Sequence, residues 1–495
     1  MQTTRPLGII ALALSGGGYR AAAFHLGTMR ALDELGLLGD VRVLSTASGG
    51  SIVGARYALS VARGHDFAQF SRELSQLLGT NVVADALDLL HRGPRAPSLI
   101  QRAAEVYDRH FGGARLGELA DDPRVKARFD RVVVNATHFS QGYAFRFQFP
   151  PRPRVPFGNR GVTLPPDAWG KVRLADAVAA SSCFPAGFEP LPFPDDFDWG
   201  GDAPPAVTGT SVAAGEQATE TSLPLMDGGI YDNQAIAAVL LSGGRTPDEE
   251  LGLLLASDTD QRHTPYYTTP KPGGLARGLG AAPLGVVLLG ALGVGVGAAA
   301  WAWSASGPAA TVAHVVATLA IAIFVLVVVA LEVAQASLPF PYPRLALQLL
   351  QTTVSGLGAM VATRALSVLA LTTKVFMVRV RDLGYRLAHA ELPGRVVALH
   401  IYAADGALDR LDPSAPSPAV RARAARARDM DTSLWMTPEE RHDVEATGYA
   451  TTLASLVRYL RRWREKGAAL RDDRAFPEDL CERAERAWER ANAVD

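Results

Sequence analysis

One stretch of this chain limits its possible folds more than any other. From Gly278 to Leu331, about 54 consecutive residues include no Asp, Glu, Lys or Arg. A polar break at residues 304–308 divides the stretch into two apolar segments, each of which could cross a hydrocarbon core as a helix, since that takes about 20 residues. We therefore predict a transmembrane helical hairpin, although a pair of buried core helices in a large soluble domain remains an alternative. The hairpin is expected over residues 271–335, with helices at about 279–303 and 311–331.

The charges that flank the apolar stretch predict its orientation. Lys271 and Arg277 precede it and Arg344 follows it, whereas the turn between the two halves is uncharged. Lys and Arg accumulate on the cytoplasmic side of membranes. We expect a multi-pass protein of the inner or cytoplasmic membrane, with its soluble part in the cytoplasm. The two cysteines, Cys183 and Cys481, are too far apart for a disulfide framework or a metal knuckle, which agrees with a reducing compartment.

The soluble part is expected to have an α/β fold. Residues 1–265 alternate short apolar runs with helical patterns, which is typical of a sandwich with a mostly parallel central sheet. Residues 336–495 are mainly helical, and a strand near 395–402 could complete the same sheet. The formal net charge of −1 argues against nucleic acid as a partner. The expected strands before the hairpin cover residues 8–14, 41–46, 131–137 and 251–256, and the expected helices cover 21–35 and 52–61.

A glycine-rich turn follows the first predicted strand. Gly16, Gly17 and Gly18 come directly before an amphipathic helix, so their amides would point outward at a helix N-terminus, where negative charge is favoured. Such a turn could form an oxyanion hole or cradle a nucleotide phosphate. The second interpretation lacks both a Walker-type lysine and the acidic residue expected about 20 residues further on.

A serine stands where the second predicted strand meets a helix. Ser48 is followed by Gly49 and Gly50, as a nucleophile elbow requires, because small neighbours allow a sharp turn. Thr46 occupies a position at which the elbow pattern has glycine. Ser45 and Ser51 are rival nucleophiles, but Ser48 alone has glycine at both following positions.

A carboxylate precedes two glycines far downstream. Asp227, with Gly228 and Gly229 behind it, could be presented from a tight turn and accept a proton from a serine as general base. An ordinary turn aspartate that bonds its own backbone is the alternative. Just upstream, residues 196–222 are rich in Gly, Pro, Ala and Thr, which predicts a mobile surface loop. The loop could act as a lid or be an ordinary disordered insertion.

Taken together, these segments resemble the patatin-like phospholipases, which are related to the catalytic domain of cytosolic phospholipase A2. The resemblance rests on the order Ser-Gly-Gly-Gly-x-Arg from Ser15, the serine elbow and Asp-Gly-Gly. It extends to residues 134–137 and 179–185, covers roughly residues 8–260, and has a weaker echo at Gly448-Tyr449. It implies a three-layer sandwich and a lipid acyl hydrolase of phospholipids or lysophospholipids.

The resemblance also assigns roles to residues. Ser48 would attack the ester and Asp227 would take its proton, without a catalytic histidine, cofactor or metal. The amides at residues 16–18 would stabilise the oxyanion, with Arg20 supporting that loop, and the glycines at 49, 50, 228 and 229 would support the elbow and the dyad. The expected partners are membrane lipids as substrate and the bilayer. Two alternatives remain open: a Ser-His-Asp esterase using His263 or His400, and a membrane scaffold that has lost its chemistry.

Overall fold

In the computed structural model the chain divides into two compact units. The first comprises Met1–Thr264 and Phe376–Asp495, and the second comprises Pro265–Val375. The structure describes all residues except 1–4, 93–97, 151–156, 160–161, 165–166, 186, 214–215, 242–250, 260–281, 305, 337–349, 372–374, 402–414, 472–473 and 494–495.

The first unit is built on a mixed sheet of eight strands in its described part, in the order β11-β10-β1-β2-β3-β9-β6 with β4 also paired to β3. The strands β11, β10, β1, β2 and β3 run parallel, whereas β4 and β9 are antiparallel to β3. The expectation of a mostly parallel sheet therefore holds for one half only. The strands are β1 Ile9–Leu14, β2 Val41–Ala47, β3 Arg131–His138, β4 Tyr143–Phe149, β6 Leu191–Phe193, β9 Leu223–Asp227, β10 Leu251–Asp258 and β11 Val396–His400.

The antiparallel half has a physical reason in the connections. A parallel pair needs a long crossover, whereas β3 and β4 are joined by a short turn of residues 139–142, which forces them to run antiparallel. The four strands expected before the hairpin are confirmed, each to within two residues of its expected ends.

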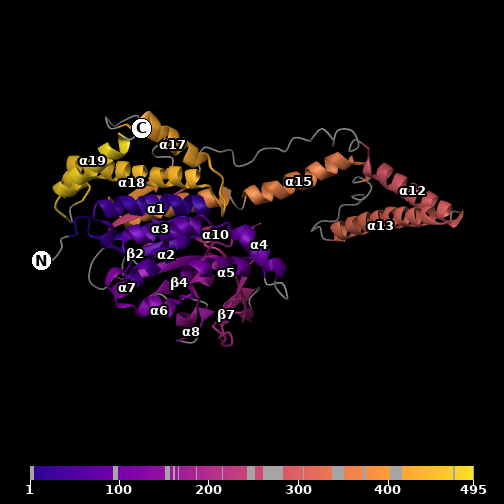
Figure 1. Cartoon of the computed structure of the whole chain (residues 1–495), viewed down its shortest axis with the longest axis horizontal. Helices are drawn as coiled ribbons and strands as arrows, with labels where there is room; N and C mark the ends of the chain where they lie inside the picture. Colours follow the sequence, from indigo (N-terminus) through magenta and orange to yellow (C-terminus); the bar gives the residue numbers. More distant parts are fainter. Residues whose placement is uncertain are drawn as a thin grey trace. The chain divides into compact units, whose positions relative to one another are not determined.

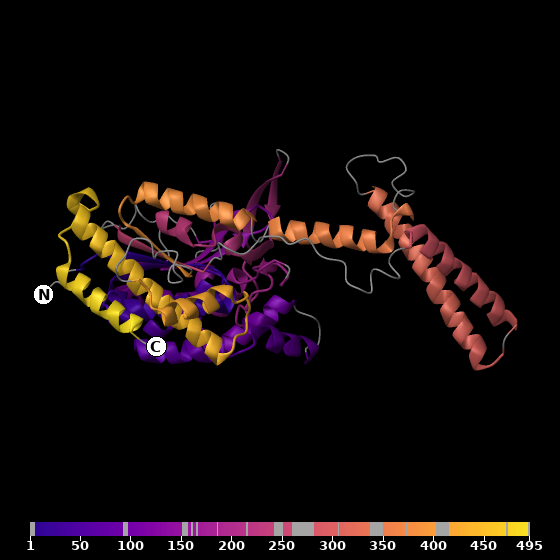
Figure 2. The ribbon, with the colours of Figure 1, turned by 90° about the horizontal axis from the view of Figure 1, so that it is seen from above.

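Helices cover both faces of this sheet. Ile10, Leu12 and Leu14 lie in the larger apolar core, while Ile9 and Ala11 lie in a smaller one, as the alternation of side chains along a strand requires. The larger core is closed by helices that include α1 and α2, and the smaller by α11 and α16. Figure 2 shows α16 on one side of the sheet and the amino-terminal helices on the other. The sandwich therefore has three layers.

The helices of the first unit are α1 Gly18–Glu34, α2 Gly49–Ala62, α3 Phe67–Leu78, α4 Val82–Arg92, α5 Leu99–Phe111, α6 Leu116–Asp121, α7 Pro123–Arg128, α8 Ala168–Lys171, α9 Leu174–Ser181, α10 Gly229–Asp232, α11 Ile236–Leu240, α16 Phe376–Glu391, α17 Pro418–Asp429, α18 Pro438–Lys466 and α19 Glu478–Asn492, with short 3-10 helices η1 Leu38–Asp40 and η6 Gly467–Ala469.

The long helix α18 lies against α1 (Figure 1). It begins with a capping box between Thr437 and Glu440, as the Thr-Pro-Glu-Glu sequence predicts. A Cβ atom at Gly27 of α1 would lie 1.9 Å from a backbone oxygen of α18, and one at Gly448 of α18 would lie 2.0 Å from the carbonyl oxygen of Phe24. The two glycines thus let the helix backbones approach closely, which explains why Gly448 belongs to the recognisable pattern.

The residues between Asp195 and Ser222 are not a structureless loop. They contain β7 Thr208–Ala213 and β8 Glu216–Glu220, which pair as an antiparallel hairpin and join β5 Val162–Thr163 in a small second sheet. Thr and Val favour strands, and this preference outweighs the turn signal of the neighbouring glycines.

The second unit carries two long apolar helices, α12 Leu284–Ser304 and α13 Pro308–Ala336, followed by α15 Val354–Ala370. By length and composition, Leu284–Ser304 and Pro308–Val327 could each cross a membrane. The two helices pack on each other, with Gly295 against Ala320 and Ile321. The flanking charges Lys271, Arg277 and Arg344, on which the predicted orientation depends, lie outside the described residues.

Candidate active site

Ser48 sits on a strained turn between β2 and α2. Its φ of 49° and ψ of −121° are rare for a residue with a side chain. A Cβ atom at Gly49 would lie 2.0 Å from the carbonyl oxygen of Gly18, and one at Gly50 would lie 2.3 Å from that of Leu14. Only glycines allow the start of α1 and the end of β1 to approach the turn this closely.

Thr46 fits into the elbow without disturbing it. Its hydroxyl donates to the carbonyl of Val133 at 2.8 Å and lies 2.9 Å from Ser51 Oγ. Its methyl group occupies space that Gly54 leaves open, since a Cβ atom there would lie 2.4 Å from Thr46 Cγ2. The absence of a side chain at Gly54, on the next helix, therefore leaves room for a threonine at this position of the elbow.

The hydroxyls of the two rival serines are buried and hydrogen-bonded to other groups. Ser45 is fully buried and donates to the carbonyl of Ala235 at 2.7 Å. Ser51 is fully buried between Thr46 and Ser181, whose oxygens lie 2.9 and 2.8 Å from its own. Neither hydroxyl faces a carboxylate within the described part of the chain, so Ser48 is the favoured nucleophile.

Asp227 lies at the end of β9, where it meets Ser48. Strand β3 pairs with both β2 and β9, so that Ala47 is opposite Asn135 and Asp227 is opposite Ala136. This pairing brings together residues that are far apart in the chain, and the Ser48 side chain lies close enough to the Asp227 carboxylate to lower its pKa. The sheet register thus places the turn of Ser48 beside the turn of Asp227.

The Asp227 carboxylate is buried, and hydrogen bonds offset part of the cost of burying it. The Gly229 amide donates to its Oδ1 at 2.6 Å. Burial raises the pKa of Asp227 to about 6, and the hydrogen bonds from Ser48 and Gly229 limit that rise. A carboxylate with a pKa near 6 is a better proton acceptor than an exposed aspartate and is still ionised at neutral pH.

The glycines that follow Asp227 leave room for its surroundings. A Cβ atom at Gly228 would lie 2.2 Å from the carbonyl oxygen of Asn135. One at Gly229 would lie 2.5 Å from Asn233 Oδ1. The Asp-Gly-Gly sequence is therefore required by close packing on both sides of the turn.

The glycine-rich turn lies directly beside Ser48. A Cβ atom at Gly16 would lie 3.0 Å from Ser48 Cβ, and Gly17 has a φ of 135° that side chains rarely adopt. The Gly16 amide donates to the carbonyl of Asn233 at 2.9 Å. In the described part of the chain, the amides of Gly17 and Gly18 have no intramolecular acceptor. The Gly16 amide is thus already bonded within the chain, which leaves the amides of Gly17 and Gly18 as the candidate oxyanion donors.

Arg20 braces this turn from the far side. Its buried guanidinium donates to the carbonyl of Met430 at 2.5 Å and to that of Thr259 at 3.1 Å. The Tyr19 amide donates to the carbonyl of Ser433 at 2.8 Å. Residues 428–433, which sequence analysis did not assign to the site, therefore hold the amino end of α1.

Ser181 is a second element that sequence analysis missed. It lies at the end of α9, and its hydroxyl accepts the Ser48 amide at 3.0 Å and donates to the carbonyl of Asn135 at 2.5 Å. Its carbonyl accepts the Gly228 amide at 3.1 Å. One residue thus ties the backbones of both turns. Its signal in the sequence was the stretch 179–185, which resembled a family motif but carried no assigned role.

Comparison with known proteins identifies this arrangement. Residues 12–258, from β1 to the end of β10, match the family described as patatin-like phospholipase. The chain belongs to the patatin-like phospholipase family. Members are lipid acyl hydrolases, so the domain is a hydrolase domain of the phospholipase type.

The other comparisons are weaker. No curated protein sequence is significantly similar to the chain. Among solved structures, the crystal structure of VipD from Legionella pneumophila is similar, with 13% sequence identity, coverage of 99% of this chain and 92% of that chain, and a TM-score of 0.26.

Histidines do not complete a triad in the described part of this patatin-like domain, where none is hydrogen-bonded to Ser48 or Asp227. His400 lies beside Asp258, with 3.6 Å between its Nδ1 and Oδ2. His263 lies outside the described residues. Among the described residues, no group of three or more His, Cys, Asp or Glu side chains could hold a metal ion.

His25 supports the glycine-rich turn from behind. Its Nε2 lies 2.8 Å from the carbonyl oxygen of Ser15 and must carry the hydrogen, so Nδ1 accepts from the Ser257 hydroxyl at 2.8 Å. Complete burial lowers the pKa of His25 to about 4. The ring is therefore neutral at physiological pH and has a structural role.

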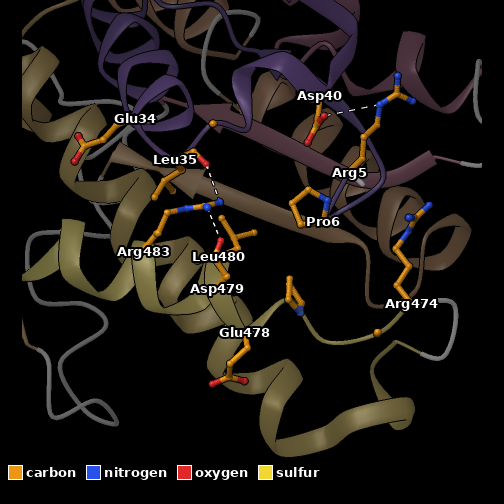
Figure 3. A pocket seen from close by; sticks show the side chains of 13 residues that line it. Arg5, Pro6, Glu34, Leu35, Asp40, Arg474, Glu478, Asp479, Leu480 and Arg483 are labelled. Atoms are coloured by element: carbon orange, nitrogen blue, oxygen red, sulfur yellow. Dashed lines mark hydrogen bonds and ion pairs between the residues drawn. The ribbon is translucent and has the colours of Figure 1, made fainter. Parts of the chain in front are cut away.

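A large open pocket lies elsewhere in the patatin-like unit. It has a volume of about 1000 Å³ and is lined by Arg5 and Pro6, the end of α1, and residues 474–483 (Figure 3). Arg5 and Pro6 precede β1, whereas Ser48 follows the parallel strand β2, so the pocket is at the opposite edge of the sheet. Its arginines include Arg5, paired with Asp40, and Arg483, paired with Asp479. Neither Ser48 nor Asp227 lines it.

Proposed function

We propose that this protein is a membrane-anchored lipid acyl hydrolase that cleaves fatty-acyl esters of phospholipids or lysophospholipids through a Ser48–Asp227 dyad. The observation that carries the proposal is the sheet register that places Ser48, on a strained turn, beside the buried Asp227 carboxylate, whose pKa it lowers, within a patatin-like domain. The apolar helices α12 and α13 support the anchoring. The cytoplasmic location of the catalytic unit is proposed from the flanking Lys and Arg residues of the sequence.

The first half of the reaction forms an acyl-enzyme. Ser48 Oγ attacks the ester carbonyl carbon while Asp227 accepts the hydroxyl proton. The tetrahedral intermediate then collapses, the carbon–oxygen bond to the alcohol breaks, and Asp227 returns the proton to the departing alkoxide. The alcohol, such as a lysophospholipid, leaves, and the fatty acyl group remains as an ester of Ser48.

The second half releases the fatty acid. Asp227 accepts a proton from a water molecule as its oxygen attacks the acyl-enzyme carbonyl. Collapse of the second tetrahedral intermediate breaks the bond to Ser48 Oγ, which takes the proton back from Asp227. The same carboxylate therefore serves both halves, in keeping with the raised pKa of Asp227.

The amides of Gly17 and Gly18 are the proposed oxyanion donors. They lie at the N-terminus of α1, where the helix dipole favours negative charge. Each donor of this type typically contributes about 3 kcal/mol of transition-state stabilisation. Both oxyanions of the pathway form at the same carbonyl oxygen, so one pair of amides serves both steps.

Exposed aromatic residues beside the dyad support an apolar substrate. Phe184 is 41% exposed and directly follows Cys183, whose carbonyl accepts the Asp227 amide at 3.0 Å. Tyr231, in the turn after Asp227, is 39% exposed. Aromatic side chains at the mouth of a site can cover an acyl chain while it leaves the bilayer.

The decisive experiment compares variants of the detergent-solubilised full chain on mixed phospholipids and on a chromogenic ester. Ser48→Ala and Asp227→Asn should each lower kcat by about three orders of magnitude or more. Ser60→Ala and Asp232→Asn are matched controls, since both residues are buried and lie outside the dyad. Full activity of Asp227→Asn, or fluorophosphonate labelling of a serine other than Ser48, would contradict the dyad.

The pH profile supplies an independent test of the base. Because Asp227 must be ionised to accept a proton and its pKa is about 6, kcat/KM should be level above pH 6 and fall tenfold per unit below it. The profile is measured with a soluble ester, so that lipid ionisation does not contribute. A level profile down to pH 4 would exclude a base with the properties of Asp227.

A further inference from the structure

Thr259 contacts the glycine-rich turn more extensively than any local sequence signal suggests. Its hydroxyl donates to the carbonyl of Gly16 at 3.1 Å, and its buried amide donates to Ser15 Oγ at 3.2 Å. A Cβ atom at Gly17 would lie 2.7 Å from Thr259 Oγ1. Its carbonyl accepts the Arg20 guanidinium at 3.1 Å. Thr259 thus touches both the start of the turn and the arginine that braces it.

The preceding residue faces the other side of the sheet. Asp258 is fully buried, and its Oδ2 lies 2.8 Å from Arg381 Nε and accepts the Tyr385 hydroxyl at 3.0 Å. His400 Nδ1 lies 3.0 Å from a terminal nitrogen of Arg381. A buried ion pair with these additional partners has a well-defined geometry, because both charges must keep their contacts to remain buried.

These contacts stand at the two places where the chain leaves and re-enters the catalytic unit. Thr259 lies a few residues before Pro265, the first residue of the apolar unit, and Arg381 lies a few residues after its last residue, Val375. The Asp258–Arg381 pair therefore joins the two ends of the insertion, while the adjacent Thr259 holds the turn with the proposed oxyanion donors.

We propose that Thr259 is a positioning residue for the oxyanion-binding amides of Gly17 and Gly18, and that the Asp258–Arg381 ion pair, which joins the two chain segments that flank the insertion in the sequence, fixes Thr259 in place. This inference rests on the proposed function, since it assumes that those amides stabilise the oxyanion. Thr259 does not touch the substrate and acts through the Gly16 carbonyl.

The position of the amides matters most in the transition state. Oxyanion donors act on a charge that is absent from the bound ester, so a small displacement of the turn weakens transition-state binding and leaves ground-state binding unchanged. Loss of the Thr259 hydroxyl should accordingly change kcat and not KM. Loss of overall stability would instead lower the amount of active protein.

The first experiment compares Thr259→Val with Thr259→Ser in the full chain in detergent. Valine keeps the volume of threonine and removes the hydrogen bond to Gly16, so kcat on a soluble ester should fall about tenfold, with KM changed less than about twofold. Serine keeps the hydroxyl and should restore kcat to within about twofold. Thr452→Val is the matched control, because Thr452 is also fully buried and donates to a backbone carbonyl, that of Gly448, at 2.8 Å.

Fluorophosphonate labelling of Ser48 separates positioning from misfolding. In Thr259→Val the labelling rate should fall while the final labelled fraction matches the wild type, because every folded molecule still reacts. A reduced final fraction with an unchanged rate would overturn the inference, since it would mean that Thr259 only stabilises the fold. Unchanged kcat and labelling rate would overturn it as well.

A second variant tests the ion pair. Arg381→Lys keeps the positive charge and removes most of the hydrogen-bonding groups of arginine, so kcat should fall in the same direction as in Thr259→Val, by about threefold. A kcat equal to that of the wild type would remove Asp258–Arg381 from the proposal. The Ser48→Ala variant is assayed beside these variants. If Ser48→Ala is inactive while Thr259→Val is fully active, the positioning inference fails and the proposed function holds. If Ser48→Ala is active, the proposed function itself fails.

Discussion

The central sheet of the catalytic unit and the α12–α13 pair are both apolar, but they differ in where their side chains go. Val132 and Val134 in the sheet are completely buried. In the pair, Leu289 is 68% exposed, Leu326 71% and Trp303 93%. The apolar side chains of the sheet are buried inside the protein, whereas several of those on the described part of the pair are exposed.

This difference shows that apolar composition alone does not reveal whether the side chains of a region are buried within the protein or exposed on it. Burial of apolar side chains stabilises the sheet by about 25 cal/mol per Å². Exposing the apolar side chains of the helix pair to water costs free energy by the same measure. Soluble proteins accordingly rarely expose apolar patches larger than a few hundred Å². The catalytic unit is therefore expected to fold by itself, and the pair to fold in contact with lipid.

The sharpest test of this comparison places the same charge in both regions. Val132→Asp puts an unpaired carboxylate in the sheet core, so we expect a loss of more than about 4 kcal/mol of stability and no folded enzyme. Leu289→Asp should leave the activity on a soluble ester intact. Thermal unfolding and esterase assays of both variants provide the measurement. Equal losses in the two variants would contradict the proposed difference.

A second prediction concerns the buried polar groups of the catalytic unit. Arg381→Met leaves Asp258 buried without its ionic partner, so the free energy of unfolding should fall by about 3–5 kcal/mol. Arg426→Met is the control, since Arg426 pairs with Asp443 on an exposed surface, where loss of a pair costs at most about 1 kcal/mol. Denaturant unfolding in detergent measures both. Similar losses would show that the buried pair is not specifically required.

A third prediction sharpens the role of lipid for the helix pair. Val294 and Leu319 lie near the middle of the two apolar segments. An arginine at either position should cost about 2.5–3.5 kcal/mol of membrane insertion, so that Val294→Arg/Leu319→Arg shifts the protein from the alkaline-extracted membrane pellet to the supernatant. Ser304→Arg, at a helix end, should remain in the pellet. Retention of the double variant would argue that the pair is covered by protein.

The smallest effect concerns the buried carboxylate of the proposed dyad, Asp227. The pKa of Asp227 is raised to about 6 from 3.8, so its ionised form destabilises the native state above pH 6. Asp227→Asn should therefore raise stability by up to about 3 kcal/mol near pH 8. The gain should shrink as pH falls below 6 and vanish near pH 4, where the native aspartate is protonated. Differences in melting temperature between the variant and the wild type from pH 4 to 8 provide the test, and a pH-independent difference would contradict it.

Much of the local structure follows from contiguous residues. The apolar runs at β1, β2, β3 and β10 and the capping box at Thr437 are where the sequence predicts them, because strand alternation and helix capping depend on neighbours in the chain. The glycines beside Ser48 and Asp227 were recognisable for the same reason. A turn that approaches another backbone closely requires glycine, and this requirement is visible in the sequence.

Other features depend on residues that are distant in the chain, and only the tertiary structure decides them. The Gly16 amide is occupied by Asn233, Ser181 ties the turns of Ser48 and Asp227 together, and Thr259 meets the glycine-rich turn across more than 200 residues. No local pattern marks such partners, because a hydrogen bond depends on which backbones the packing brings together. The sequence by itself determined which residues could do the chemistry, and the packing of the sheet determined which of them meet.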